Sequence, residues 1–171
     1  MKKIILLAAA AFMITTGVNA QETTFGAKAG FTSGNAKVDV GSASVSSSES
    51  GFFVGLVVDI PVSEGFHVQP EALYTNIDDT SFLQIPVLAK YLIGETGLNL
   101  QAGPQFNLVL EETADDFSSL SVGLTGGVGF DFTEKFFAEA HYNVQLTNSF
   151  TGSEDITSKI DFFNIGVGYR F

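Results

Sequence analysis

Hydrophobic and polar residues alternate one by one along most of the chain from residue 24 onward. The segment 98–110 is a clear case, with apolar side chains at every second position from Leu98 to Leu110 and mostly amide or glycine residues between them. A period of two places successive side chains on opposite faces of a strand, whereas a helix needs a period of 3.6. The pattern recurs eight times and predicts eight strands, at 24–34, 50–60, 66–76, 82–93, 98–110, 120–132, 136–147 and 159–171.

The lengths of these segments and of the connections between them favour a membrane-spanning barrel. Each segment has roughly 10–13 residues, close to the about 9–11 of a tilted transmembrane strand and well above the about 5–6 of an ordinary strand. Short and long connections alternate, as in outer-membrane barrels. The tight turns are 61–65, 94–97 and 133–135; the long loops are 35–49, 111–119 and 148–158, and 77–81 is a short connection on the same side. We therefore expect an all-β fold, an eight-stranded antiparallel up-and-down transmembrane β-barrel.

The composition of the two faces decides which of them meets lipid. The apolar face carries no charged residue, and a charge facing hydrocarbon costs roughly 2–4 kcal/mol at the midplane. The other face is rich in glycine and amides, which suit the narrow interior of an eight-stranded barrel. A soluble ligand-binding barrel with the faces reversed is the alternative. Tyrosines and several Phe near the strand ends suggest aromatic girdles, and prolines 70, 86 and 104 predict local bulges because proline donates no backbone hydrogen bond.

The first 20 residues resemble an export signal. Lys2 and Lys3 precede an apolar run from Ile4 to Ile14, and small residues lead up to Ala20, so we expect cleavage after Ala20. The run is too short for a spanning helix, which needs about 20 residues. This divides the chain into a signal peptide, 1–20, and a barrel domain, 21–171.

Charge and composition exclude some partners and chemistries. The net charge is −11, and removing Lys2 and Lys3 leaves 6 basic against 19 acidic residues, or −13. Nucleic-acid binding depends on Lys and Arg neutralising phosphates, so no nucleic-acid partner is expected. The chain has no cysteine, which removes disulfides and thiolate chemistry.

Ionisable residues on the predicted inner face are the candidate chemistry. Both histidines, His67 and His141, lie there near glutamates, which would be compatible with a hydrolase, with a metal site or with a structural network. Because buried charges must be paired, we favour the network and assign no catalytic, cofactor or metal residue. Its predicted members are Lys28, His67, Glu71, Lys90, Glu139, His141 and Arg170.

The predicted outer loops carry acidic pairs and a serine-rich stretch. Solvated charge is the simpler interpretation of the acidic pairs, and divalent-ion bridging to anionic surface lipid is the alternative. The low-complexity stretch from Gly41 to Ser50 predicts a flexible extracellular loop. The pairs are Asp78-Asp79, Glu111-Glu112, Asp115-Asp116 and Glu154-Asp155.

Three segments resemble a known family. The opening 25–31, the segment 82–91 with its Leu-x-Ile-Pro and following Lys-Tyr, and the ending 165–171 are together similar to the PorT-like family of outer-membrane barrel proteins. The resemblance implies an outer-membrane β-barrel, and the family's name-giving member is associated with a secretion and gliding apparatus. Tyr169 and the terminal Phe171 also resemble the signal by which barrel-assembly machinery recognises its clients.

The sequence therefore predicts a Gram-negative outer-membrane protein that is not an enzyme. We expect a monomeric structural or interaction barrel that contacts membrane lipid, presents loops at the cell surface to a protein partner, and is an accessory of an envelope or secretion assembly. The alternatives are a small ligand- or lipid-binding barrel or narrow porin, and a membrane-embedded hydrolase.

Overall fold

A computed structural model describes residues 23–40, 43–111, 118–150 and 156–171. Within these ranges the chain forms eight strands and no helix. They are β1 Thr24–Val40, β2 Ala43–Ser63, β3 Phe66–Ile77, β4 Thr80–Leu92, β5 Leu98–Val109, β6 Leu120–Asp131, β7 Phe136–Gln145 and β8 Ile156–Arg170. The expected signal peptide, most of the loop 111–119 and residues 151–155 of the last outer loop lie outside the described residues.

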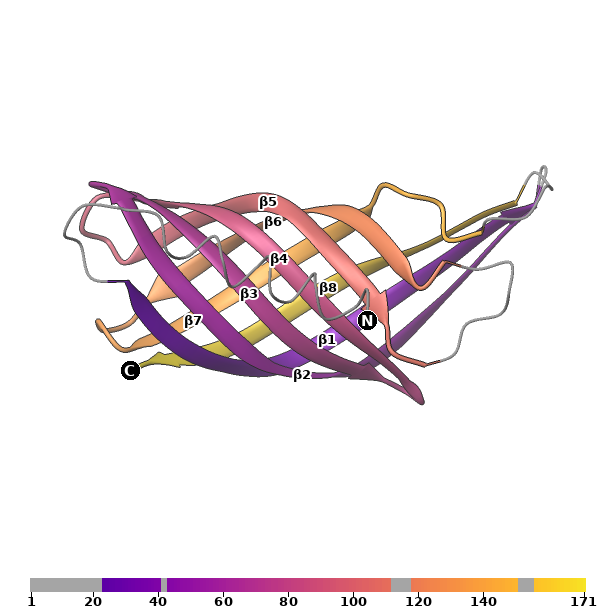
Figure 1. Ribbon diagram of the computed structural model, residues 1–171, viewed down its shortest axis with the longest axis horizontal. Coiled ribbons are helices and arrows are strands. Elements are labelled where there is room, and N and C mark those ends of the chain that lie inside the picture. The colour runs from indigo at the N-terminus through magenta and orange to yellow at the C-terminus, as the bar shows by residue number, and fades with distance from the viewer. Residues whose placement is uncertain (1–22, 41–42, 112–117, 151–155) are drawn as a thin grey trace, which may run out of the picture.

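The strands close into an antiparallel barrel in chain order, with β1 paired to both β2 and β8 (Figure 1). The predicted fold, an eight-stranded up-and-down barrel, is confirmed. Tight turns join the strands at the end where β1 begins and β8 ends: Gly65, Gly94 and Gly97 have positive φ there, a conformation that glycine adopts without steric cost. We call this end of the barrel the short-turn end and the other the outer end.

At the outer end, the strands continue where a long loop was expected. β1 and β2 stay paired in one register from Thr24↔Asp59 to Val40↔Ala43, and β8 follows β1 up to Val40↔Ile156. The paired sheet formed by residues 34–40, 43–50 and 156–161, here called the outer sheet, projects beyond the barrel (Figure 1). The prediction of a long loop at 35–49 was therefore wrong for 35–40 and 43–49, and that of a flexible loop at 41–50 was wrong for 43–50. Residues 44–50 are exposed on both faces, so this part of β2 lacks the apolar alternation that revealed the other strands.

The prolines do not produce the predicted bulges. Pairing between β3 and β4 is interrupted after Pro70↔Val87, but it resumes at Leu73↔Gln84 in the same register. β4 and β5 likewise keep one register on both sides of their gap, and Pro104 pairs with Leu124 in an unbroken ladder. Because proline has no N–H, hydrogen bonds between the strands are lost at these positions. No extra residue is inserted into either strand, so the register is unchanged and no bulge forms. Among the strand pairs that the structure describes, the one register shift lies between Pro61 and Ser63, beside a tight turn.

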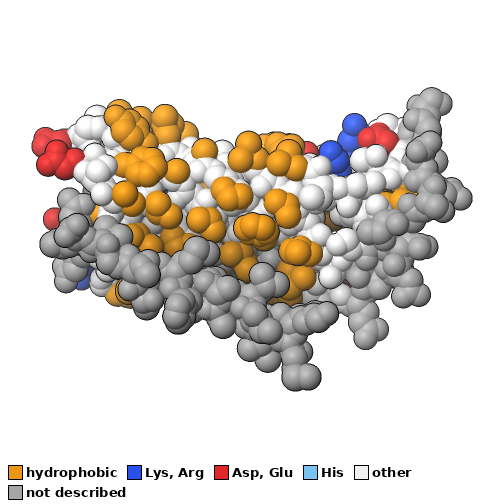
Figure 2. Space-filling model, turned by 45° about the horizontal axis from the view of Figure 1, so that its top comes forward, with side chains coloured by type: hydrophobic (Ala, Val, Ile, Leu, Met, Phe, Trp, Pro, Cys, Tyr) orange, Lys and Arg blue, Asp and Glu red, His pale blue; other side chains and the backbone are white. Residues whose placement is uncertain are grey.

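The two faces of the barrel have opposite chemistry. Large apolar side chains cover the outside, for example Leu56, Val128 and Val167, each more than half exposed. Polar side chains fill the inside, where Gln84, Lys90 and Glu71 are buried. Figure 2 shows hydrophobic side chains over the flank of the barrel, with charged groups gathered toward the two ends. Among the described residues, no helix is long and apolar enough to cross a membrane.

Candidate functional site

A cluster of charges occupies the barrel interior on the short-turn side of its middle. Lys28 of β1 donates hydrogen bonds to Glu71 of β3 at 2.7 Å and to Glu139 of β7 at 2.8 Å. The inward face of each strand positions these side chains, because every second residue of a strand points the same way. All three side chains are at most 4% exposed, so the ammonium bridges two carboxylates across the barrel in the absence of bulk water.

Amide side chains and a histidine complete this central cluster. His141 Nε2 donates to Gln101 Oε1 at 2.6 Å, which makes Nε2 the protonated nitrogen, and Gln101 Nε2 donates to Glu139 Oε1 at 2.9 Å. Gln69 Nε2 donates to both Glu71 and Glu139. With a neutral imidazole and both carboxylates ionised, two negative charges face one ammonium, so the cluster has a formal charge of −1.

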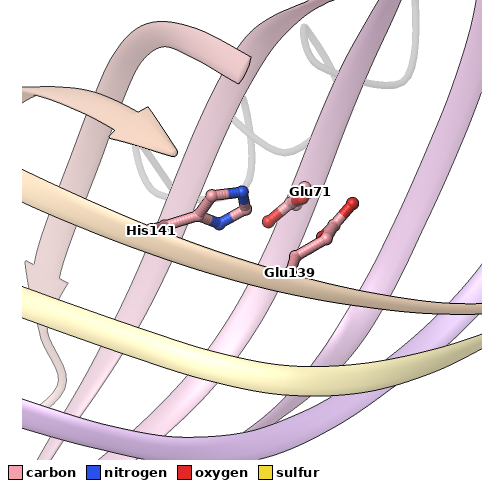
Figure 3. A group of neighbouring side chains, drawn as sticks. All are labelled: Glu71, Glu139 and His141. Atoms are coloured by element: carbon pink, nitrogen blue, oxygen red, sulfur yellow. The ribbon is translucent and has the colours of Figure 1, made fainter. Parts of the chain in front are cut away.

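Glu71, Glu139 and His141 also have the composition of a metal site. Figure 3 shows the three side chains pointing toward one another from β3 and β7, and one ligand atom of each lies within 4.8 Å of the others. The Lys28 ammonium, however, already lies within hydrogen-bond distance of both carboxylates. A divalent ion at the same place would have to approach this positive charge, so the arrangement suits an internal ion pair better than a metal.

A second charge cluster closes the short-turn end of the interior. Lys90 Nζ donates to Asp59 Oδ2 at 3.0 Å, and His67 Nδ1 forms a very short contact with Asp59 Oδ1. Arg170 of β8 donates to Asp131 at 2.6 Å, and its guanidinium lies 4.4 Å from the centroid of the Phe137 ring. Lys90 and Arg170 balance the two aspartates, so this cluster is neutral when His67 is neutral.

The structure places all seven predicted network residues on the inner face but divides them between the two clusters. Lys28, Glu71, Glu139 and His141 belong to the central cluster, while His67, Lys90 and Arg170 belong to the short-turn cluster. The two histidines therefore have different partners. The predicted network did not include Asp59 and Asp131, although the period of two places both on the inner face. They are the two carboxylates of the short-turn cluster.

Uncharged polar side chains that hydrogen-bond to one another fill the outer half of the interior. Thr32 Oγ1 donates to Asn164 Oδ1 at 2.6 Å, and Asn164 Nδ2 donates to Gln84 Oε1 at 2.8 Å, linking β1, β8 and β4 across the barrel. A second group joins β5, β6 and β7 through Gln105, Asn107, Thr125 and Asn143. The first group crosses the lumen from β8 to β4, and the second fills the space along the neighbouring strands β5, β6 and β7.

An apolar cap lies above these amides, at the base of the outer sheet. Ile77, Phe82 and Phe162 are buried against one another, with the two rings edge to face at a centroid distance of 5.2 Å. Val109 and Ile160 pack against them. The interior thus combines polar networks with buried apolar side chains such as Phe53, Leu73, Leu88 and Phe137, and its outer mouth is apolar.

Aromatic side chains surround the outside of the short-turn end. Tyr169 lies 5.0 Å from Phe136 and 6.1 Å from Phe171, measured between ring centroids. The Lys135 ammonium lies over the Tyr169 ring at 5.8 Å. Tyr169 and Phe171, the predicted assembly signal, are both exposed here, and Phe171 is 71% exposed.

A closed eight-stranded barrel with an apolar exterior, an aromatic rim and a filled polar interior defines the class of small integral outer-membrane barrels. The chain belongs to the outer membrane protein beta-barrel domain family, whose model matches residues 4–171. It is accordingly a protein of the outer membrane.

Solved structures share the fold at low sequence identity. Neisserial surface protein A is 17% identical, with 88% of this chain and 100% of that chain covered and a TM-score of 0.53. Ail, the attachment invasion locus protein of Yersinia pestis, crystallised with the heparin analogue sucrose octasulfate, is 17% identical with the same coverage and a TM-score of 0.51. A search of curated protein sequences gives no match. These likenesses show the fold alone.

Proposed function

We propose that this protein is a closed, non-enzymatic membrane anchor that presents its outer sheet to a protein partner at the cell surface. The observation that carries the proposal is the continuation of β1, β2 and β8 past the barrel as a paired sheet. Strands that only span the bilayer need about 9–11 residues, whereas β1 has 17 and β2 has 21. The additional length forms an ordered surface that crossing the membrane does not require.

The filled interior supports an anchor over a pore. Open aqueous channels come with about 16–18 strands, while eight strands leave room only for side chains. Here Lys28 and Asn164 contact side chains of strands that are not their neighbours, and the Ile77–Phe82–Phe162 cap lies at the outer mouth. Water and solutes would have to break these contacts to pass.

The finer assignments are part of the same proposal. The similarity of residues 82–91 to the PorT-like group supports a role as an accessory of an envelope or secretion assembly. We further propose that the barrel is a monomer in contact with membrane lipid, that export follows cleavage after Ala20, and that barrel-assembly machinery recognises Tyr169 and Phe171.

The test compares the full chain with a variant whose outer sheet is shortened. Replacing residues 36–47 by Asn-Gly joins Asn35 to Ser48, which already face each other across the two strands, by a two-residue hairpin turn. Both tagged chains are crosslinked in the native outer membrane, purified in mild detergent, and analysed for stoichiometric partners. We expect a partner with the full chain and none with the shortened one; the same partner with both chains would exclude the outer sheet as the contact surface.

Conductance provides the second arm of this test. The purified full chain in planar bilayers is expected to show no reproducible conductance steps, because the lumen is filled. Stable, uniform steps that disappear with the unfolded protein would instead identify a narrow pore and overturn the anchor proposal.

A further inference from the structure

The outer sheet has one sealed edge and one open edge. On the β8 side, side chains and a short segment satisfy the backbone: Asn148 Nδ2 donates to the Ile156 carbonyl, and Asn148 Oδ1 accepts from the Ser158 N–H. The Ser149 N–H donates to the Ser158 carbonyl, and Gln145 Oε1 accepts from the Ile160 N–H. This edge offers little to an incoming strand.

The β2 side is different. β2 pairs with β3 only from Gly51 onward, because β3 ends at Ile77 and turns back at Asp78. Within the described part of the chain, residues 43–50 pair with β1 alone. A strand edge of this kind presents a row of unpaired N–H and C=O groups.

The open edge also lacks the features that usually protect one. Exposed edges are commonly blunted by lysine, proline or a bulge. Residues 43–50 contain no lysine and no proline, and their register with β1 is unbroken. Ser44, Ser46 and Ser48 are small side chains that leave the backbone accessible.

A cavity of about 170 Å³ lies beside this edge, above the apolar cap. Its apolar walls are Ala36, Ile77, Phe82 and Ile160, and Ser47 and Glu49 of the open edge line it as well. An engineered cavity of about 150 Å³ holds a benzene molecule, so this one has room for a side chain the size of Leu or Phe. A strand added beside β2 would continue the line of β3 and point every second side chain toward the cavity.

The cavity face of the outer sheet is acidic, whereas the opposite face carries two lysines, Lys37 and Lys159, together with two aspartates, Asp39 and Asp161. Glu49 and Asp78 border the cavity, and no cationic side chain lines it. Lys37 and Lys159 face each other on adjacent strands, and the period of two places them on the opposite face of the sheet. The cavity face is thus both apolar and acidic.

We propose that β2 residues 43–50 accept an extended segment of a partner protein as an added strand, with an apolar side chain of that segment in the cavity and a lysine or arginine beside Glu49 or Asp78. This inference rests on the proposed function and names the chemistry of the partner. A second copy of this chain fits poorly, because its own residues 43–50 offer no basic residue and only Val45 as a larger apolar one.

A synthetic peptide provides the probe. It has nine residues, with Thr on one face and Lys, Leu, Lys and Val in order on the other. Its affinity for the full chain in detergent micelles is measured by fluorescence anisotropy, and backbone amide shifts map the contact. We expect saturable binding with the largest amide shifts in residues 43–50.

Two N-methylated forms of the peptide test strand addition directly. N-methyl groups on alternate residues remove the N–H groups on one edge of the peptide and leave all side chains in place. Because only one edge of the peptide faces β2, one form should lose binding and the other should keep it. Equal binding of both forms, or loss of both, would overturn strand addition.

Protein variants test the cavity and the charge. Ala36→Phe fills the cavity from its far wall and should weaken binding by about tenfold or more, as should Glu49→Lys, in keeping with the loss of one buried contact or the reversal of one charge pair. Lys37→Gln is the matched control on the other face and should stay within about twofold. Unchanged affinity in both Ala36→Phe and Glu49→Lys would overturn the assigned site, and so would concentration-dependent dimers in place of peptide binding.

These outcomes separate the two proposals. If the peptide fails to bind while shortening residues 36–47 still removes the crosslinked partner, the outer sheet acts without strand addition, and only the present inference fails. If shortening leaves the partner in place, the proposed function itself fails.

Discussion

The ring of Phe137 occupies the space that a side chain on Gly168 would need. The two residues face each other on β7 and β8, and a Cβ added at Gly168 would overlap three atoms of the ring. The guanidinium of Arg170 lies over the same ring, 4.4 Å from its centroid. Glycine at this position therefore permits the packing that orients the short-turn cluster.

Gly168→Ala should destabilise the barrel. The added methyl group forces the buried Phe137 ring and the neighbouring guanidinium to shift, and overpacking of this kind costs about 1–3 kcal/mol. The free energy of unfolding, measured by urea titration of the barrel in lipid vesicles, reports the loss. Gly126→Ala is the matched control, because a Cβ there meets nothing within 4 Å. Equal stability of the two variants would contradict the packing described for Phe137.

Removing Lys28 should leave two buried carboxylates without their cation. Loss of one partner of a buried ion pair costs about 3–5 kcal/mol, and we expect Lys28→Met to lower the free energy of unfolding by this amount. Lys37→Met is the surface control: the Lys37–Asp39 pair is exposed at 3.5 Å, and such pairs contribute about 0–1 kcal/mol.

A compensating variant tests the cause of that loss. Replacing Glu71 and Glu139 by Gln in the Lys28→Met background removes the unpaired charges and should recover most of the stability. No recovery would mean that the loss came from packing of the lysine stem and not from charge.

The sequence predicted the spanning strands well because lipid and lumen impose opposite chemistry on alternate residues. Leu98 and Asn99 show the rule: one is exposed on the apolar outside and the other is buried in the polar inside. Residues 44–50 are exposed on both faces and are mostly serine, so their polarity does not alternate, and this part of the outer sheet could not be predicted from the signal. The alternation of Ala36, Val38 and Val40 with Lys37 and Asp39 is only five residues long. Small Ser and β-branched Val side chains were the remaining indication there.

The division of the interior into two clusters was also beyond the sequence. Periodicity places Lys28 and Lys90 on one face, but it does not say which carboxylate each one reaches. The pairing of each lysine depends on the stagger between strands around the closed barrel. This stagger brings the Glu139 carboxylate of β7 to the Lys28 ammonium of β1. Asp59 and Asp131 were visible on the inner face, but only this geometry shows that they pair with Lys90 and Arg170.

Glu111 should titrate at an unusually low pH. A small loss of hydration raises its pKa, but hydrogen bonds from the backbone N–H groups of Ser81, at 2.8 Å, and of Glu111 itself outweigh this effect and hold the pKa below its ordinary value of 4.5. Because the folded pKa is depressed, the contact stabilises the outer end above the ordinary pKa and is lost as the pH falls through the folded value. The amide proton shift of Ser81 should follow this titration, and Glu111→Gln should abolish it. A midpoint at or above 4.5 would contradict the hydrogen bond.

Phe171 should matter for assembly in the cell more than for the finished barrel. Its N–H donates to the Phe25 carbonyl at 2.9 Å, but its side chain is 71% exposed beside Tyr169. Phe171→Ala keeps the backbone bond and removes only the exposed ring. We expect a several-fold drop in the amount of folded protein in the outer membrane, while refolding into lipid vesicles, where no assembly machinery acts, changes no more than for the loss of another lipid-facing side chain, about 1.5–3 kcal/mol in the free energy of unfolding.

Val167→Ala provides the comparison for this variant, because Val167 lies on the same outer face of β8 and is 64% exposed. Both substitutions reduce the apolar surface that meets lipid, but only the terminal ring belongs to the proposed assembly signal. If both variants reach the outer membrane at equal levels, Phe171 is an ordinary residue of the aromatic rim. If Phe171→Ala alone is depleted in the cell and both refold alike in vesicles, the deficit arises before the barrel forms, at the step where assembly machinery recognises its C-terminal strand.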